Sequence, residues 1–166
     1  MLSFVSRYLK PEIKITHSNE LREGPAIVTG TSRAAESLLT TPFRSVRCIA
    51  YSYKGYVSVD SRKGAVPSLI REETAYTTFM LDLPGGETVT AIPQKPGSGM
   101  SADEHRTMQF NRGNEFVAVE EAIRPGKKVQ VEGMVVRRNG QWEIKYKLLT
   151  DLGGADGADS TARRKK

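Results

Sequence analysis

The stretch VQVEGMVVRRNGQWEIKYKL, residues 129–148, decides the fold of this chain. Asn139 and Gly140 stand between two runs of alternating side chains. Asn-Gly is the strongest short signal for a β-hairpin, because both central positions of a type I′ turn need positive φ. The turn also fixes the register of the two strands, so that Gly133 lies opposite Tyr146.

Alternation along the hairpin separates apolar from charged side chains, since successive residues of a strand point to opposite faces. One face predicts a core side, and its members are Val129, Val131, Gly133, Val135, Trp142, Ile144, Tyr146 and Leu148. The other face predicts a solvent side, and its members are Gln130, Glu132, Met134, Val136, Arg138, Glu143, Lys145 and Lys147. We expect Gly133 to leave room for the Tyr146 ring and the Arg137 guanidinium to lie on Trp142.

Basic residues mixed with aromatics are typical of single-stranded nucleic-acid binding, which stacks bases on exposed rings beside positive charge. Here the register sends the aromatics and the lysines to opposite faces. A structural hairpin is therefore favoured over a nucleic-acid platform, and the nucleic-acid alternative rests on a basic rim. The candidate residues for contact with an anion or a partner are Lys127, Lys128, Arg137, Arg138, Lys145 and Lys147.

The positive charge is concentrated in the last quarter of the chain. The 166 residues carry a formal net charge of +6, yet residues 1–123 hold 14 basic and 14 acidic side chains. Residues 124–150 hold 7 basic and 2 acidic side chains. This distribution invites a polyanionic partner without establishing one.

Most of the remaining sequence also predicts strands. Alternating or β-branched runs with turn residues at their ends occupy residues 24–31, 44–59, 73–83, 88–93 and 115–123. Pro-Gly-Gly-Glu at 84–87 is a turn that joins two of these runs into a hairpin. Neither face of the run that holds Cys48 is purely polar, so we expect it to be covered on both sides. We predict a mainly β fold, a compact barrel-like or sandwich-like domain with OB-like elements and one or two short helices.

Three parts are expected along the chain. They are a short helix and linker over residues 1–23, a β-rich domain over 24–152 and a disordered basic tail over 153–166. Within the domain, the polar residues 93–114 predict a long loop, and residues 32–39 have some helical character.

The N-terminal residues predict a two-turn amphipathic helix, which Pro11 ends. Two turns are marginal as an isolated helix, so this helix needs a surface to pack on. We expect it to cap the domain, and the alternatives are docking on a partner or on a membrane surface. The residues of this candidate docking helix are Leu2, Phe4, Val5, Tyr8 and Leu9.

The sequence offers no recognisable catalytic motif, and we expect no enzymatic activity, no cofactor and no metal. The single cysteine, Cys48, is expected to be a small core residue rather than a reactive thiol. His105 follows Asp103 and Glu104 but has no second histidine nearby, so an exposed loop or helix start is favoured over a metal or acid–base site. No run approaches 18 apolar residues, so no transmembrane segment is expected. Together with the single cysteine, this favours a cytoplasmic protein.

Three segments together form a pattern of strand starts, turns and a buried cysteine position. Residues 38–53 (LLTTPFRSVRCIAYSY) contribute Leu39, Pro42, Cys48, Tyr51 and Tyr53. Residues 79–93 (FMLDLPGGETVTAIP) contribute Phe79, Asp82, Gly86, Val89 and Pro93. Residues 120–144 (EEAIRPGKKVQVEGMVVRRNGQWEI) contribute Glu121, Ile123, Pro125, Gly126, Val129, Val131 and Gly133. In this order they resemble the GIDE domain, also called the beside-a-membrane domain, over residues 24–150.

The resemblance implies a β-rich module for which no catalytic residues are carried over. Family members usually have flanking transmembrane helices, and its ubiquitin ligases add a zinc-binding RING, whereas this sequence shows neither. We therefore expect a non-catalytic interaction or adaptor module that docks on a protein partner or assembly. One alternative is an OB-type single-strand nucleic-acid-binding protein that uses the basic last quarter. Another is peripheral membrane contact through the N-terminal helix and the basic tail.

Overall fold

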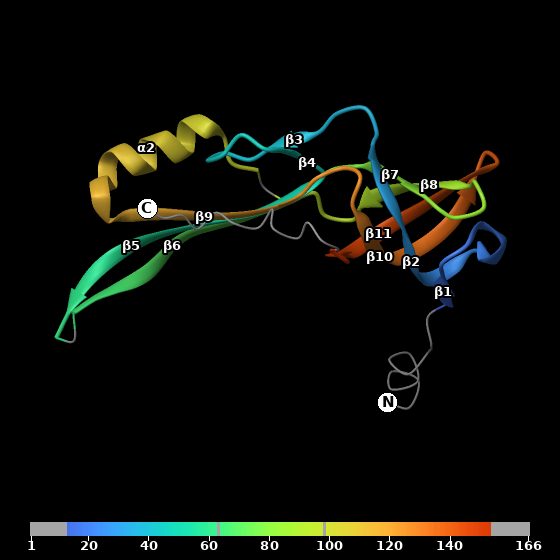
Figure 1. Ribbon diagram of the computed structural model, residues 1–166, viewed down its shortest axis with the longest axis horizontal. Helices are drawn as coiled ribbons and strands as arrows, with labels where there is room; N and C mark the ends of the chain where they lie inside the picture. The colour runs from blue at the N-terminus through green and yellow to red at the C-terminus, as the bar shows by residue number, and fades with distance from the viewer. Residues whose placement is uncertain (1–12, 63, 98, 154–166) are drawn as a thin grey trace.

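The computed structural model of the chain describes residues 13–62, 64–97 and 99–153. The candidate docking helix and the basic tail beyond Gly153 lie outside the described residues. The described part is mainly β, as predicted, and consists of a five-stranded barrel and a three-stranded arm (Figure 1). None of its helices is long and apolar enough to cross a membrane.

Five strands close the barrel: β2 (Gly24–Ala34), β7 (Phe79–Asp82), β8 (Thr88–Pro93), β10 (Lys128–Arg138) and β11 (Gln141–Asp151). β8 and β11 are parallel, and the other neighbouring pairs are antiparallel. Counted along the chain, the order around the barrel is first, second, third, fifth, fourth. This is the order of a Greek-key OB barrel, so the predicted OB-like elements are present.

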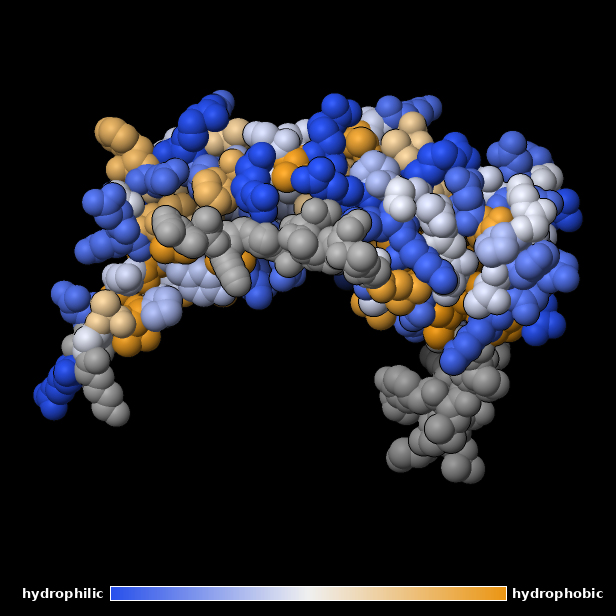
Figure 2. Space-filling model, viewed as in Figure 1, coloured by the Kyte–Doolittle hydropathy of each residue, from blue (hydrophilic) through white to orange (hydrophobic). Residues whose placement is uncertain are grey.

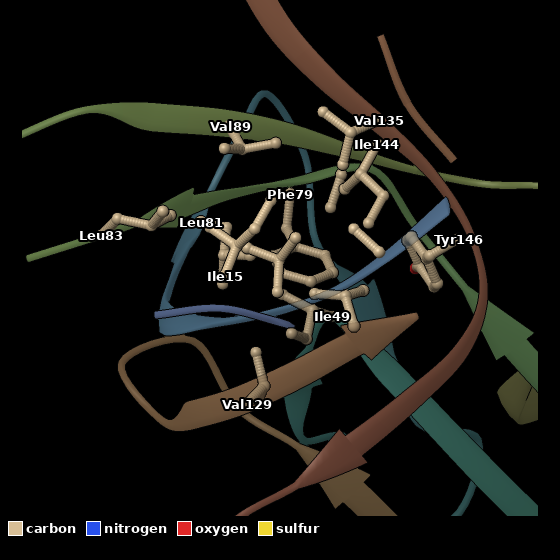
Figure 3. Close-up of a cluster of buried hydrophobic side chains, with 14 residues drawn as sticks. Ile15, Ile49, Phe79, Leu81, Leu83, Val89, Val129, Val135, Ile144 and Tyr146 are labelled. Carbon is tan, nitrogen blue, oxygen red and sulfur yellow. The ribbon is translucent and has the colours of Figure 1, made fainter. Parts of the chain in front are cut away.

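Alternate residues of the barrel strands point inward and form its core. Figure 3 shows Phe79 and Leu81 of β7 among these inward side chains. Three buried residues from outside the five strands join them: Ile15, at the end of β1 (Ile13–Ile15), Ile49, and Leu83, which follows β7. β1 pairs in parallel with β2, and the short 3-10 helix η1 (Ser18–Glu20) follows it. Residues 13–20 are therefore part of the fold, although the sequence suggested a linker there.

The hairpin of β10 and β11 has the predicted turn, and its six pairs nearest the turn have the predicted register. Asn139 and Gly140 have φ angles of 54° and 79°. The guanidinium of Arg137 lies 5.1 Å from the centroid of the Trp142 ring, as expected.

A β-bulge between Glu132 and Gly133 then shifts the pairing by one residue. The prediction that Leu148 faces the core is therefore wrong: its side chain is 52% exposed, and Leu149 packs against the core instead. The expectation that Gly133 leaves room for the Tyr146 ring is also wrong. A Cβ at this position would meet the backbone of the opposite strand, rather than the Tyr146 ring.

The arm combines strands from two separated segments of the chain. β5 (Ala50–Ser61) and β6 (Gly64–Tyr76) form a long hairpin, and β9 (Phe116–Ile123) pairs with β5 on its other side. Because β9 is shorter, the end of the hairpin projects beyond it. Smaller elements, β3 (Leu39–Thr40) and β4 (Arg47–Cys48), pair beside the arm. The helical character expected for residues 32–39 is not realised, since β2 continues to Ala34 and a loop leads into β3.

The helix α2 (Ala102–Arg112) covers one face of the arm, so the long loop predicted for residues 93–114 is wrong. Ser101 and Glu104 form a capping box, in which each side chain accepts a hydrogen bond from the backbone of the other at 3.0 Å. α2 has few apolar residues, and its one buried residue is His105, so apolar periodicity gave no signal. A 3-10 turn, η2 (Gly113–Glu115), leads from α2 into β9.

A second core lies between α2 and the arm. Its buried members are Cys48, Tyr51, Tyr53, Ala75, Met100, Phe116 and Ala118. Cys48 therefore packs in this core while its neighbour Ile49 packs in the barrel, so the chain is covered on both sides at these two residues. Further along β5 only one face is buried, since Ser52, Lys54 and Tyr56 are partly exposed, and the expected cover on both sides is wrong there. The barrel and the arm together form an arch with a hollow on the side away from α2 (Figures 1 and 2).

Candidate functional site

A group of buried polar side chains lies under α2. The hydroxyl of Tyr53 is 2.8 Å from Nδ1 of His105, and the two rings meet edge to face. Phe43 also packs against the imidazole, with ring centroids 4.7 Å apart. His105 lies near the start of α2, which was one of the two expected settings, but it is only 4% exposed, so the expected exposure is wrong.

Glu120 is the second ionisable member of this group, because it lies on the helix-facing side of β9, opposite Tyr53. It is 2% exposed, and its carboxylate accepts hydrogen bonds from the backbone N–H groups of Phe43 and Arg44. The carboxylate thus holds the loop between β3 and β4 against the arm.

Burial shifts the pKa values of this group toward the neutral forms. Desolvation lowers the pKa of His105 and raises the pKa of Glu120. It also raises the pKa of Cys48 to about 12 and the pKa of Tyr53 to about 12. A thiol that stays protonated is a poor nucleophile, which agrees with the predicted core role of Cys48. These side chains are closed to solvent, and their contacts fix α2 and the loop after β3 to the arm.

The predicted basic residues do not form one patch. Arg137 and Arg138 lie at the turn end of β10, while Lys127 and Lys128 precede or begin the same strand, roughly 30 Å away at about 3.3 Å per residue. Arg138 pairs with Glu143 at 3.2 Å, and the Arg137 guanidinium covers Trp142.

The two lysines of β11 are also separated from these rims. Lys147 lies 4.0 Å from Glu132, and Lys145 points outward from the middle of the strand, opposite Met134. The six basic side chains thus lie at separate places along the hairpin. Within the described residues, no exposed aromatic platform lies beside them.

OB barrels commonly bind oligonucleotides on the outer face of their second and third strands, which are β7 and β8 here. The outward residues of these two strands are Met80, Asp82, Thr88, Thr90 and Ile92. None of them is aromatic or basic, and Asp82 is held by Arg33 through two hydrogen bonds of 2.9 and 3.0 Å. The surface therefore lacks the stacking rings and positive charge that single strands require.

A different surface lies on the arm, on the side turned away from α2, and we call it the concave face. Cross-strand pairing defines three rows of side chains on it: Leu69–Tyr56–Val117, Glu72–Lys54–Val119 and Thr74–Ser52–Glu121. The outermost row is apolar and open, since Leu69 is 46% exposed and Val117 is 55% exposed. In the middle row, Lys54 lies 4.0 Å from Glu72.

A cavity of about 380 Å³ lies at the inner end of the concave face, where the arm meets the end of β11. Its walls include Tyr76 and Ile123 from the arm and Leu149 from the barrel. Two carboxylates, Glu121 and Asp151, also line it. Within residues 13–62, 64–97 and 99–153, neither carboxylate forms an ion pair.

Sequence reasoning did not find the concave face, because its rows join strands far apart in the chain. The alternation in residues 116–123, which sets Val117 and Val119 on the face opposite Phe116 and Ala118, was a signal that the sequence offered. No group of three or more His, Cys, Asp or Glu side chains that could hold a metal ion occurs in the described part of the chain.

Comparisons with protein-family models, with curated proteins and with solved structures found no match for this chain.

Proposed function

We propose that this chain is a non-catalytic interaction module that docks on a protein partner through the concave face of its arm. The observation that carries the proposal is the open apolar row Leu69–Tyr56–Val117, which lies on the same face of the arm as a cavity between the arm and the barrel. An exposed apolar strip with polar residues around it is typical of a protein interaction site. The resemblance to GIDE domains supports the same class of function.

The ionisable groups under α2 support the non-catalytic part of the proposal. Cys48, Tyr53, His105 and Glu120 are each less than 5% exposed, so a substrate could reach them only if α2 moved away. Their hydrogen bonds go to one another, to nearby backbone or to the neighbouring side chains of Thr41 and Gln109, as expected of side chains that hold a fold together.

Photo-crosslinking in cells of the native host tests this proposal. A photoreactive phenylalanine analogue replaces Val117 on the concave face or, as the matched control, Phe110, which is 88% exposed on α2. We expect a discrete protein adduct from position 117 and none from position 110. Adducts from neither position, or equal adducts from both, would contradict the proposal.

Single-strand nucleic-acid binding is the second candidate function, supported by the basic rims and by the OB topology of the barrel. It predicts that labelled oligonucleotides bind at low salt and are released steeply as salt increases, because each phosphate contact releases a counterion. Unchanged oligonucleotide mobility at low salt would exclude it. In the crosslinking experiment, the same function would give an adduct sensitive to nuclease.

A further inference from the structure

We infer that the partner segment bound by the concave face carries apolar side chains next to a lysine or arginine. This inference rests on the proposed function and adds the chemistry of the partner. It follows from the arrangement of apolar and acidic groups along the arm.

The spacing of apolar and acidic side chains along the concave face sets the spacing of apolar and basic side chains in the partner segment. The apolar row and the row that contains Glu121 are four residues apart on β5, which is about 13 Å at 3.3 Å per residue. Three adjacent strands make the face about 10 Å wide. A short segment of chain fits these dimensions, with its apolar side chains over Tyr56 and its cation at the cavity.

The negative charge at the cavity favours a cationic side chain of the partner at the inner end of the concave face. Glu121 is exposed and Asp151 is half-buried, and both line the cavity. Lys54, in the adjacent row of the face, lies 4.0 Å from Glu72. Two carboxylates repel phosphate and anionic lipid headgroups, so the same charges that attract lysine or arginine disfavour nucleic acid and membranes here.

The aromatic ring in the cavity wall strengthens this preference. Tyr76 lies on the concave side at the base of the arm, and its ring packs edge to face against Tyr146, with centroids 6.1 Å apart. Aromatic faces attract lysine and arginine side chains. Ile123 and Leu149 supply aliphatic walls for the methylene stem of such a side chain.

Binding through side chains on the face is favoured over addition of a strand to the β6 edge. Pro67 lies in β6 and has no backbone N–H to donate. The pairing of β5 and β6 also contains a β-bulge between Gly55 and Tyr56. Proline and bulges are devices that keep an edge strand from pairing with another chain.

A displayed library of random twelve-residue peptides, selected against the full chain, tests the inference. We expect enriched peptides that combine apolar residues with lysine or arginine. Synthetic versions should bind the wild-type chain and lose about tenfold in affinity with Glu121→Lys and with Val117→Asp, since each removes one part of the match. Val117→Thr, which keeps the β-branched side chain, is a milder variant that should fold normally and still weaken binding.

Two matched controls carry the same chemical changes elsewhere. Glu36→Lys reverses an exposed charge in the loop between β2 and β3, and Phe110→Asp alters an exposed apolar residue on α2. Both should bind like the wild type. Acidic enriched peptides, no enrichment, or equal losses in the controls would overturn the inference. So would a dimer in sedimentation equilibrium that Val117→Asp dissociates, because the occupant would then be a second copy.

If Val117 crosslinks to a protein segment that contains no lysine or arginine, the interaction module stands and the inferred chemistry is wrong. If no protein crosslinks at all, the module itself is contradicted.

Discussion

Gly133 shows how one residue controls the geometry of the central hairpin. It lies beside the bulge between β10 and β11. A Cβ at this position would overlap the carbonyl oxygen of Lys145 and lie 2.7 Å from the Cα of Tyr146. Neither contact is with the flexible end of a side chain, so the strands themselves would have to separate.

Replacing Gly133 with alanine should therefore destabilise the protein by about 2 kcal/mol or more, as overpacked positions do. Urea denaturation followed by circular dichroism measures this change. Met134→Ala is the matched control, because Met134 is the next residue and is 45% exposed. It should change the free energy of unfolding by no more than about 0.5 kcal/mol. Equal effects of the two variants would contradict the role assigned to Gly133.

His105 makes the stability of the folded protein depend on pH. Burial lowers its pKa in the folded protein below the ordinary value of 6.5. Between this lowered pKa and pH 6.5, His105 is protonated in the unfolded chain but neutral in the folded protein. His105 therefore contributes stability above pH 6.5 that is lost as the pH falls toward its folded pKa. Glu120 acts in the opposite direction, because its raised pKa favours the protonated folded state as the pH falls.

We expect His105→Gln to reduce the loss of stability on acidification, while Glu120→Gln increases it. The free energy of unfolding, measured between pH 7.5 and about 4.5, gives both slopes. The glutamine at 105 keeps a hydrogen-bonding group near Tyr53, so the comparison isolates the charge. Parallel curves for the wild type and His105→Gln would show that His105 does not titrate on unfolding.

At the scale of the element, α2 depends on its cap. The helix presents little apolar surface, and the capping box of Ser101 and Glu104 satisfies two backbone N–H groups at its start. Such a helix forms because its ends are stabilised and because His105 and Met108 pack on the arm. Its loss would expose the second core.

Ser101→Ala should destabilise the protein by about 1 kcal/mol, the usual cost of losing a cap. Ser101→Asp should retain most of the stability, because aspartate is an equally good cap and also favours the positive end of the helix. Thermal unfolding of the three proteins provides the measurement. An alanine variant as stable as the wild type would mean that α2 is held by its packing alone.

At the scale of the whole molecule, the chain builds two cores, and adjacent residues pack on different cores at several points, among them Ala75 and Tyr76, and Ala122 and Ile123. Cys48 packs in the arm core and Ile49 packs in the barrel core, on adjacent residues. The arm is inserted into the barrel sequence, so the barrel can keep its own contacts when the arm opens. The arm cannot form in the same way without the barrel, because β9 reaches β5 only after the chain has passed through β7 and β8.

Tyr53→Ala should therefore weaken the arm more than the barrel. Hydrogen exchange should show loss of amide protection in β5, β6 and β9 while β10 and β11 keep theirs, since local opening involves contiguous structural units. Ile144→Ala, in the barrel core, should lower protection in both parts. Uniform loss of protection in Tyr53→Ala would mean that the two cores unfold as one.

Local sequence predicted the barrel better than the arm. The turn at Asn139-Gly140 needs only the φ preferences of two neighbouring residues, and the alternation around it needs only the period of a strand. The bulge beside Gly133 was missed because it depends on the close approach of two backbones. α2 was missed because its buried side chain is a histidine, whose role is visible only once Tyr53 and Phe43 are beside it.

Local sequence was enough to predict a β protein with a defined hairpin, a buried segment around Cys48 and a concentration of positive charge in its last quarter. The rows of the concave face become visible only in the fold. Tyr56 and Val117 are 61 positions apart in the chain and become neighbours through the pairing of β5 with β9. Turns and strand faces follow from short-range preferences, whereas a surface assembled across strands depends on pairings that local sequence does not encode.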